Sequence, residues 1–111
     1  MTTILEIVRI NRKHGGSLIN KSSLDFAVDK ANREENIWKS NAHLVRGIIV
    51  NHAFLDGNKS TASEIILKRF ARKNIRCNKT LFSRGIIDIA KKNEGNINKI
   101  TRRLKKWCIK R

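Results

Sequence analysis

Eight consecutive residues in the middle of the chain combine side chains that can act on a phosphate-bearing ligand. They are His52, Ala53, Phe54, Leu55, Asp56, Gly57, Asn58 and Lys59. An imidazole titrates near neutral pH and can accept a proton from an attacking hydroxyl. A carboxylate suits a Mg²⁺ ion that bridges phosphate oxygens, and an ammonium group adds positive charge. The segment therefore predicts phosphoryl or nucleotidyl transfer, in which catalysis is mostly positioning and charge stabilisation.

Apolar residues at helical spacing lie on both sides of this segment, so Asp56-Gly57-Asn58 is expected directly before a helix. The free N–H groups and partial positive charge of a helix N-terminus bind phosphate. Gly57 permits a positive φ angle and a close backbone approach to an oxyanion, and Asn58 can donate an amide hydrogen bond. We expect Lys59 to bind a triphosphate and His52, at the end of the preceding helix, to act as the base.

Each of these residues also has an ordinary structural interpretation. Phe54 is interpreted as the apolar anchor of the loop between the two helices. Asp-Gly-Asn is a common turn, an Asp or Asn before a helix is a common cap, and a single His at a helix end is usually structural. A Walker-type phosphate loop does not fit, because Asn58 separates Gly57 from Lys59.

Length and composition indicate one domain over residues 1–111. No apolar run approaches the ~20 residues needed to cross a bilayer, and the N-terminus lacks the features of a signal peptide. We therefore expect a cytoplasmic protein. Cys77 and Cys108 lack metal-site spacing and are predicted to be free thiols or small core residues, since a reducing compartment disfavours disulfides. His14 and His43 are interpreted as surface or partly buried residues outside any metal cluster.

Lys and Arg outnumber Asp and Glu by 25 to 9, which gives a formal net charge of +16. This excess predicts attraction to polyanions such as nucleic acid, nucleotides, a ribosome or an acidic protein. The alternative is that Lys and Arg only solvate the outer faces of helices. The charge is spread along the chain but is denser from Arg102 to Arg111. Aromatic residues make up 5% and Tyr is absent, so the stacking platforms of single-strand binders are poorly supplied.

The apolar pattern is helical along the chain, which contains no proline. We expect an all-α, compact single-domain bundle of about six helices. The first helix is expected to end at His14 before Gly15-Gly16, and Ser23 is expected to cap the second helix. A connector from Arg33 to Lys39 leads to a third helix capped by Ser40. The remaining expected elements are a helix from about Lys59 to Lys73, an extended link from Asn74 to Asn78, a helix that starts at Thr80 and a last amphipathic stripe from Ile97 to Cys108.

The central segment resembles the signature of the Fic/Doc (Fido) family, H-x-F-x-[D/E]-[G/A]-N-[G/K]-R. Its fixed positions fit from His52 to Lys59, and Ser60 stands in place of the final Arg. His14-Gly15-Gly16 resembles the Tyr-Gly-Gly turn that follows the first helix of Doc (death-on-curing) proteins. Thr61-Ala62 and the apolar run after it are also similar, and the length matches the small Doc type. The resemblance covers nearly the whole chain and is specific at the motif.

This resemblance implies an all-helical Fido fold and a transferase that uses ATP and Mg²⁺. Fido proteins transfer part of a nucleoside triphosphate to a protein hydroxyl, and most Fic members transfer AMP. Doc transfers the terminal phosphate of ATP to elongation factor Tu, which arrests translation, and a separate antitoxin holds it in check. The resemblance therefore implies a kinase-like toxin of a toxin–antitoxin pair, with a translation factor as its protein substrate.

The resemblance also implies a role for each residue of the motif. His52 would be the base and Asp56 the Mg²⁺ ligand, while Gly57 and Asn58 would hold phosphate oxygens. Doc has Lys at the position of Lys59, whereas AMP-transferring Fic proteins usually have Gly, and this favours transfer of phosphate. Gly57 follows Fic instead, since Doc has Ala there.

Ser60 is the departure from the family motif that bears on activity. The family Arg binds the triphosphate through a bidentate guanidinium, and its absence could lower the rate roughly 10²–10³-fold. Ser60 would still lie at the phosphate site, where Lys59 or another nearby basic residue could compensate. Two other possibilities stay open: the enzyme uses a different donor, or the protein is a degenerate scaffold that only binds a partner.

Arg33 to Lys39 occupies the place of the family's target-docking flap. The main alternative to an enzyme is a non-catalytic basic helical module that binds nucleic acid or a ribonucleoprotein.

Overall fold

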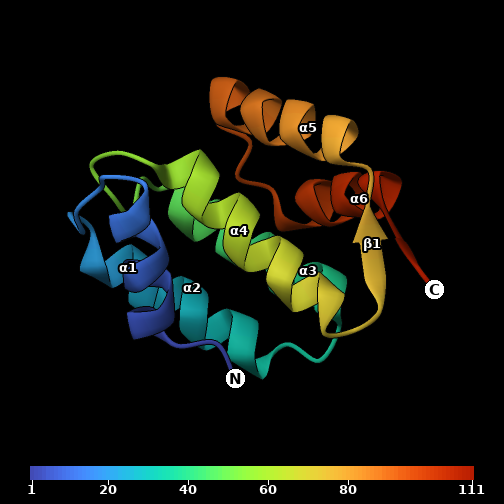
Figure 1. Ribbon diagram of the computed structural model, residues 1–111, viewed down its shortest axis with the longest axis horizontal. Coiled ribbons are helices and arrows are strands. Elements are labelled where there is room, and N and C mark those ends of the chain that lie inside the picture. Colours follow the sequence, from blue (N-terminus) through green and yellow to red (C-terminus); the bar gives the residue numbers. More distant parts are fainter.

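The computed structural model describes residues 1–111 and consists mainly of helices (Figure 1). The elements are α1 (Ile4–Lys13), α2 (Lys21–Arg33), α3 (Ile37–Val45), the π-helical turn η1 (Arg46–Val50), α4 (Asn58–Ala71), β1 (Ile75–Cys77), α5 (Lys79–Lys92), α6 (Ile97–Trp107) and β2 (Cys108–Lys110). The six α-helices confirm the all-α prediction. The extended link predicted after α4 is also confirmed, as strand β1.

Asparagine side chains begin four of the six helices. The side-chain oxygens of Asn20, Asn36, Asn78 and Asn96 accept backbone N–H groups in the first turns of α2, α3, α5 and α6. The caps predicted at Ser23 and Ser40 were wrong. Ser23 already lies inside α2, and Ser40 is buried in α3, where its hydroxyl donates to the Ala31 carbonyl at 2.6 Å. Ser and Asn cap helices about equally well, so an Asn one turn earlier takes the role.

Helix α3 lies at the centre of the core. It runs without a break into η1, because Val45 and Arg46 both keep right-handed helical dihedral angles. Its buried side chains, with those of the surrounding helices, form one apolar cluster of 25 residues. Fully buried members from α3, η1, α4, α5 and α6 include Leu44, Ile48, Ile65, Ile86 and Leu104. The end of η1 thereby fixes where the following loop, which contains the motif, leaves the core.

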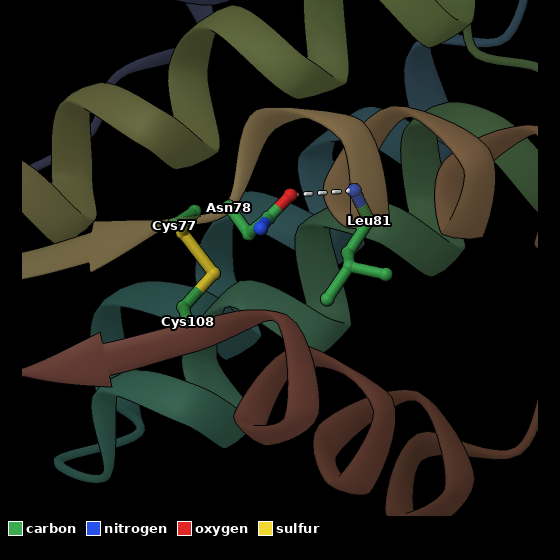
Figure 2. The surroundings of a disulfide bond; sticks show 4 residues. All are labelled: Cys77, Asn78, Leu81 and Cys108. Atoms are coloured by element: carbon green, nitrogen blue, oxygen red, sulfur yellow. Dashed lines mark hydrogen bonds between the residues drawn. A yellow bond between two sulfur atoms is a disulfide. The ribbon is translucent and has the colours of Figure 1, made fainter.

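Two short strands hold the end of α6 against the segment between α4 and α5. Strands β1 and β2 are antiparallel, and Cys77 lies opposite Cys108. A disulfide joins these two residues, whose Cα atoms are 3.9 Å apart (Figure 2). The prediction of free thiols was therefore wrong, because 31 residues of sequence separate two cysteines that the strand register brings face to face. Cysteine usage no longer supports a reducing compartment.

The longest helices, α4 and α5, have 14 residues each. No helix combines the length and the apolar character that a membrane span requires.

Loss of the disulfide is expected to lower the free energy of unfolding by about 3–4 kcal/mol. The bond closes a loop across a sequence separation of 31, and a cross-link of that size removes conformational entropy from the unfolded chain. Urea unfolding with and without a thiol-free reductant measures the difference. The Cys77→Ser/Cys108→Ser variant is the control, because its unfolding midpoint should not respond to reductant. Identical midpoints of the wild-type protein with and without reductant would contradict the prediction.

Candidate functional site

The predicted site residues meet in one surface hollow where α4 begins. The hollow has a volume of about 180 Å³ and is lined by Ile49, His52, Leu55, Asp56, Gly57, Asn58, Lys59 and Ala90. The structure thus brings His52, Asp56 and Lys59 to the same place. Ser60 lies outside this hollow and lines a neighbouring one of about 360 Å³, which Lys59 also borders. A larger hollow of about 520 Å³ between α1 and α4 contains none of the predicted site residues.

Helix α4 is the one α-helix that no side chain caps. Its N-cap residue is Gly57, and the first backbone hydrogen bond of the helix runs from the Thr61 N–H to the Gly57 carbonyl at 2.9 Å. The N–H groups of residues 58–60 donate no hydrogen bond. Unsatisfied N–H groups at a helix N-terminus carry a partial positive charge and bind anions. The end of α4 is therefore chemically suited to a phosphate.

Gly57 is required for both its conformation and its surroundings. Its φ angle is +75°, in the left-handed region that other residues rarely adopt. A Cβ atom at this position would lie 3.1 Å from the Cβ atom of His14 and 3.2 Å from the side-chain nitrogen of Asn11. The turn after α1 therefore packs directly against the start of α4. This packing leaves room for glycine and keeps the backbone N–H groups uncovered.

Asp56 is exposed beside the helix end. One of its carboxylate oxygens accepts the Gly57 N–H at 2.7 Å, which leaves the other oxygen free. No group of three His, Cys, Asp or Glu side chains is placed to hold a metal ion. Asp56 is the carboxylate at this hollow that could hold a Mg²⁺ ion, with phosphate and water as the other ligands. The residues do not fit a metal held by protein ligands alone.

His52 lies just beyond the end of η1, in the turn that leads to the motif. It is exposed, and its φ angle of +48° is uncommon for a residue with a side chain. Its imidazole makes no hydrogen bond or ion pair within the chain. The ring therefore borders the hollow with both nitrogen atoms available, as a base requires.

Phe54 and Asn58 together hold the loop in shape. Phe54 is only 1% exposed, which agrees with its predicted role as the anchor. The Asn58 side-chain oxygen accepts the Phe54 N–H at 3.0 Å, and the Asn58 side-chain nitrogen donates to the Phe54 carbonyl at 2.8 Å. Both polar atoms of the amide are thus engaged by one backbone residue. The predicted phosphate contact of the Asn58 side chain is therefore not supported, and its backbone N–H is the group left for a phosphate.

A buried residue of α1, Asn11, was missed by the sequence analysis. Its side-chain nitrogen donates to the Asp56 carbonyl at 2.9 Å and to the Thr61 hydroxyl at 3.0 Å. It is 1% exposed, and Gly16 packs against both Asn11 and the Asp56 carbonyl. Asn11 therefore joins α1 to the two ends of the Gly57 turn. The available signal was an Asn directly after Ile10 on the inward side of the first helix.

The segment Ser17–Asn20, rather than the predicted flap, lies against the motif. Leu18 forms an antiparallel β-bridge with Phe54, and the Leu55 N–H donates to the Ser17 carbonyl at 2.9 Å. Arg33 to Lys39 instead spans the end of α2 and the start of α3. Residues 40–50 of α3 and η1 lie between that segment and the motif, and these 11 residues correspond to about 16 Å of helix. The flap prediction was therefore wrong.

The other two histidines lie outside the hollow. His43 is half-buried in α3, and burial, together with the charge of Lys30, lowers its pKa below the usual range. His14 lies 3.2 Å from a carboxylate oxygen of Glu64, which also binds Lys13 at 2.6 Å. The Lys13 hydrogen bond keeps the pKa of Glu64 below its ordinary value despite partial burial. These contacts hold the end of α1 against α4.

Comparison of the chain with protein-family models, with curated proteins and with solved structures found no match.

Replacing Asn58 with alanine is expected to lower the free energy of unfolding by about 1–3 kcal/mol. The substitution removes two hydrogen bonds to the backbone of buried Phe54, each worth about 0.5–1.5 kcal/mol. Thermal or urea unfolding measures the change. Lys59→Ala is the matched control, because this neighbouring side chain is exposed and surface changes usually stay within about 0.5 kcal/mol. Equal stability of the two variants would show that the Asn58 amide does not hold the loop.

Proposed function

We propose that the protein is a Doc-like transferase that moves a phosphate, or AMP, from ATP to a hydroxyl of a protein target. The observation that carries this proposal is the convergence of His52, Asp56 and Lys59 on one hollow at the uncapped N-terminus of α4. A base, a carboxylate and an ammonium group at a free helix end form a set suited to phosphoryl transfer. A translation elongation factor is the target class implied by the resemblance, with a separate antitoxin as a second partner.

Each polar group of the site has a separate role in the proposed transfer. The N–H groups of residues 58–60 and the Lys59 ammonium bind phosphate oxygens of ATP. Asp56 would hold Mg²⁺, and the ion would neutralise phosphate charge. His52 accepts the proton of the target hydroxyl as the hydroxyl oxygen bonds to phosphorus. The bond from that phosphorus to the leaving group then breaks, which releases ADP after phosphate transfer or pyrophosphate after AMP transfer.

Two features favour phosphate transfer by a site that lacks the motif Arg. Lys59 lines both the motif hollow and the hollow that contains Ser60, so its ammonium group can contact phosphate groups of a triphosphate that extends from one hollow into the other. Lysine at this position is also the Doc feature of the motif. Ser60 offers an exposed hydroxyl and no positive charge, so it cannot replace a guanidinium. We therefore expect a slow enzyme in which Lys59 provides the cationic contact.

The rim of the hollow suits a protein target. Leu55 is 72% exposed within the hollow, and Ile19 is 58% exposed on the segment that binds the motif loop. The Ile19 N–H donates to the Ala53 carbonyl at 3.0 Å, which keeps the two apolar side chains on adjoining segments. Exposed apolar groups beside a polar site provide contact area for a protein surface.

Transfer from ATP labelled separately at the α- and γ-phosphate tests the proposal. The protein is incubated with Mg²⁺ and a cell lysate, and label in target proteins is measured. We expect transfer of the γ label by the wild-type protein, with a loss of about 10²–10⁴-fold in His52→Ala because the base is removed. Asp56→Asn should weaken the dependence on Mg²⁺. Ser60→Arg should raise the rate, because a guanidinium binds phosphate bidentately.

His43→Gln is the control, because it changes a histidine outside the hollow and should leave transfer intact. Transfer of the α label in place of the γ label would identify an AMP transferase with the same residues. Two results would overturn the proposal. One is no transfer by the wild-type protein or any variant, and the other is transfer by Ser60→Arg alone, which would mean that the native site is inactive.

A further inference from the structure

Positive charge is concentrated in the C-terminal part of the molecule. Residues 65–111 contain 16 Lys and Arg against two Asp and Glu, a formal charge of +14, whereas residues 1–64 contain nine against seven, a formal charge of +2. The first group forms the second half of α4, the two strands, α5 and α6. In Figure 1, α5 and α1 lie on opposite sides of α4, and α6 lies near the C-terminus. Most of the net charge is therefore carried by the C-terminal part of the chain.

Helix α6 presents a narrow basic stripe. Its inward residues Ile100, Leu104 and Trp107 are buried, and its exposed cations are Lys99, Arg102, Lys105 and Lys106. At about 100° of rotation and 1.5 Å of rise per residue, these four side chains lie within an arc of about 120° and about 10 Å of helix length. Helix α6 contains no acidic residue, so these four positive charges face solvent close together without an opposite charge on their own helix.

The stripe continues onto α5 through a shared carboxylate. Asp88 of α5 lies 2.9 Å from a guanidinium nitrogen of Arg103 in α6 and 3.3 Å from the Lys92 ammonium. Arg84 and Lys91, which flank Asp88 on α5, are exposed and form no ion pair. The Arg103–Asp88 ion pair thus joins the two helices, and each of them carries exposed cations. We call this surface the α5–α6 basic face; its members are Arg84, Lys91, Lys92, Lys99, Arg102, Lys105 and Lys106.

Little acidic charge neutralises this face. Only Asp88 and Glu94 are acidic in residues 65–111. Glu94 reaches Lys99 at 3.9 Å, and Arg102, Lys105 and Lys106 form no ion pair. Closely spaced, unpaired cations repel one another and hold a counterion atmosphere, so a ligand with regularly spaced negative charges is attracted to them.

We propose that the α5–α6 basic face binds the phosphate backbone of double-stranded nucleic acid without reading its sequence. A duplex carries one negative charge per about 1.7 Å of its axis, the densest array of fixed charge that such a face would meet. An acidic protein fits less well, because the exposed side of α6 offers no apolar side chain for the centre of a protein interface, and the exposed apolar residues of α5 are only Leu81 and Ile87. A single strand also fits less well, because Phe82 and Trp107 of the two helices are buried and cannot stack on bases.

This binding is independent of the transferase proposal, because it uses none of the residues that line the motif hollow. It would hold the protein near duplex DNA or structured RNA. The phosphodiester chemistry is common to both, and a comparison of binding to a DNA duplex and an RNA duplex shows which of the two is the ligand.

Fluorescence anisotropy with labelled DNA and RNA duplexes of about 20 base pairs tests the proposal across about 50–200 mM salt. The wild-type protein should bind with an affinity that falls steeply with salt. The Arg102→Gln/Lys105→Gln/Lys106→Gln variant should bind about tenfold or more weakly, and its slope of log affinity against log salt on DNA should be shallower by about 2.7, since each lost phosphate contact removes about 0.9.

The matched control is Arg9→Gln/Arg12→Gln/Arg46→Gln, which removes the same charge from exposed residues without ion pairs in the other part of the chain. It should keep most of the wild-type affinity, and His52→Ala should keep all of it. Equal weakening of the two triple variants would show a net-charge effect and overturn the proposal. Tighter binding of poly-glutamate or of a single strand than of either duplex would overturn it as well.

Discussion

The pair of hydrogen bonds between the Asn58 amide and the backbone of Phe54 is the interaction on which the site depends. Phe54 is buried in the core, so its own position is set by the packing of the surrounding helices. Asn58 is the first residue of α4, so the hydrogen bonds of its amide fix the start of the helix relative to Phe54. The hollow, the uncovered N–H groups and the placement of Asp56 follow from this join. A site on a loop is thereby held as firmly as the elements on either side of it.

A second constraint is the distribution of helix caps. Asn side chains satisfy the N-termini of α2, α3, α5 and α6, and Thr3 satisfies that of α1. At α4 the N-cap is a glycine, and the nearby Asn58 turns its amide back to Phe54. The start of α4 is thus the one α-helix start where no side chain occupies an N–H group, and the dipole effect that attracts an anion there falls off within the first turn.

The fold also separates two kinds of surface. The motif lies between η1 and α4, where acidic and basic side chains are nearly balanced, and the α5–α6 basic face lies in the part with +14 of the formal charge. The disulfide and the short sheet attach the end of α6 to the segment before α5, and the Arg103–Asp88 ion pair joins the two helices further along. These links hold mutually repelling cations side by side, which their charge alone would not favour.

The sequence by itself determined the helical class, the number of helices and the residues of the motif. Local rules sufficed for these features: apolar spacing indicated the helices, Gly15-Gly16 marked the end of the first one, and the eight-residue spacing from His52 to Lys59 identified the segment that lines the hollow. Helix starts were less predictable, because Ser and Asn compete as caps with similar energies. That competition explains why Ser23 and Ser40 were chosen and Asn20 and Asn36 were missed.

Only the tertiary structure decided what each polar side chain contacts. Asn58 could face a phosphate or its own loop, and the burial of Phe54 selected the loop. Asn11 reaches Asp56 across 45 residues, and Cys77 reaches Cys108 across 31. Such contacts depend on strand register and helix packing between distant segments, and local spacing carries no information about either.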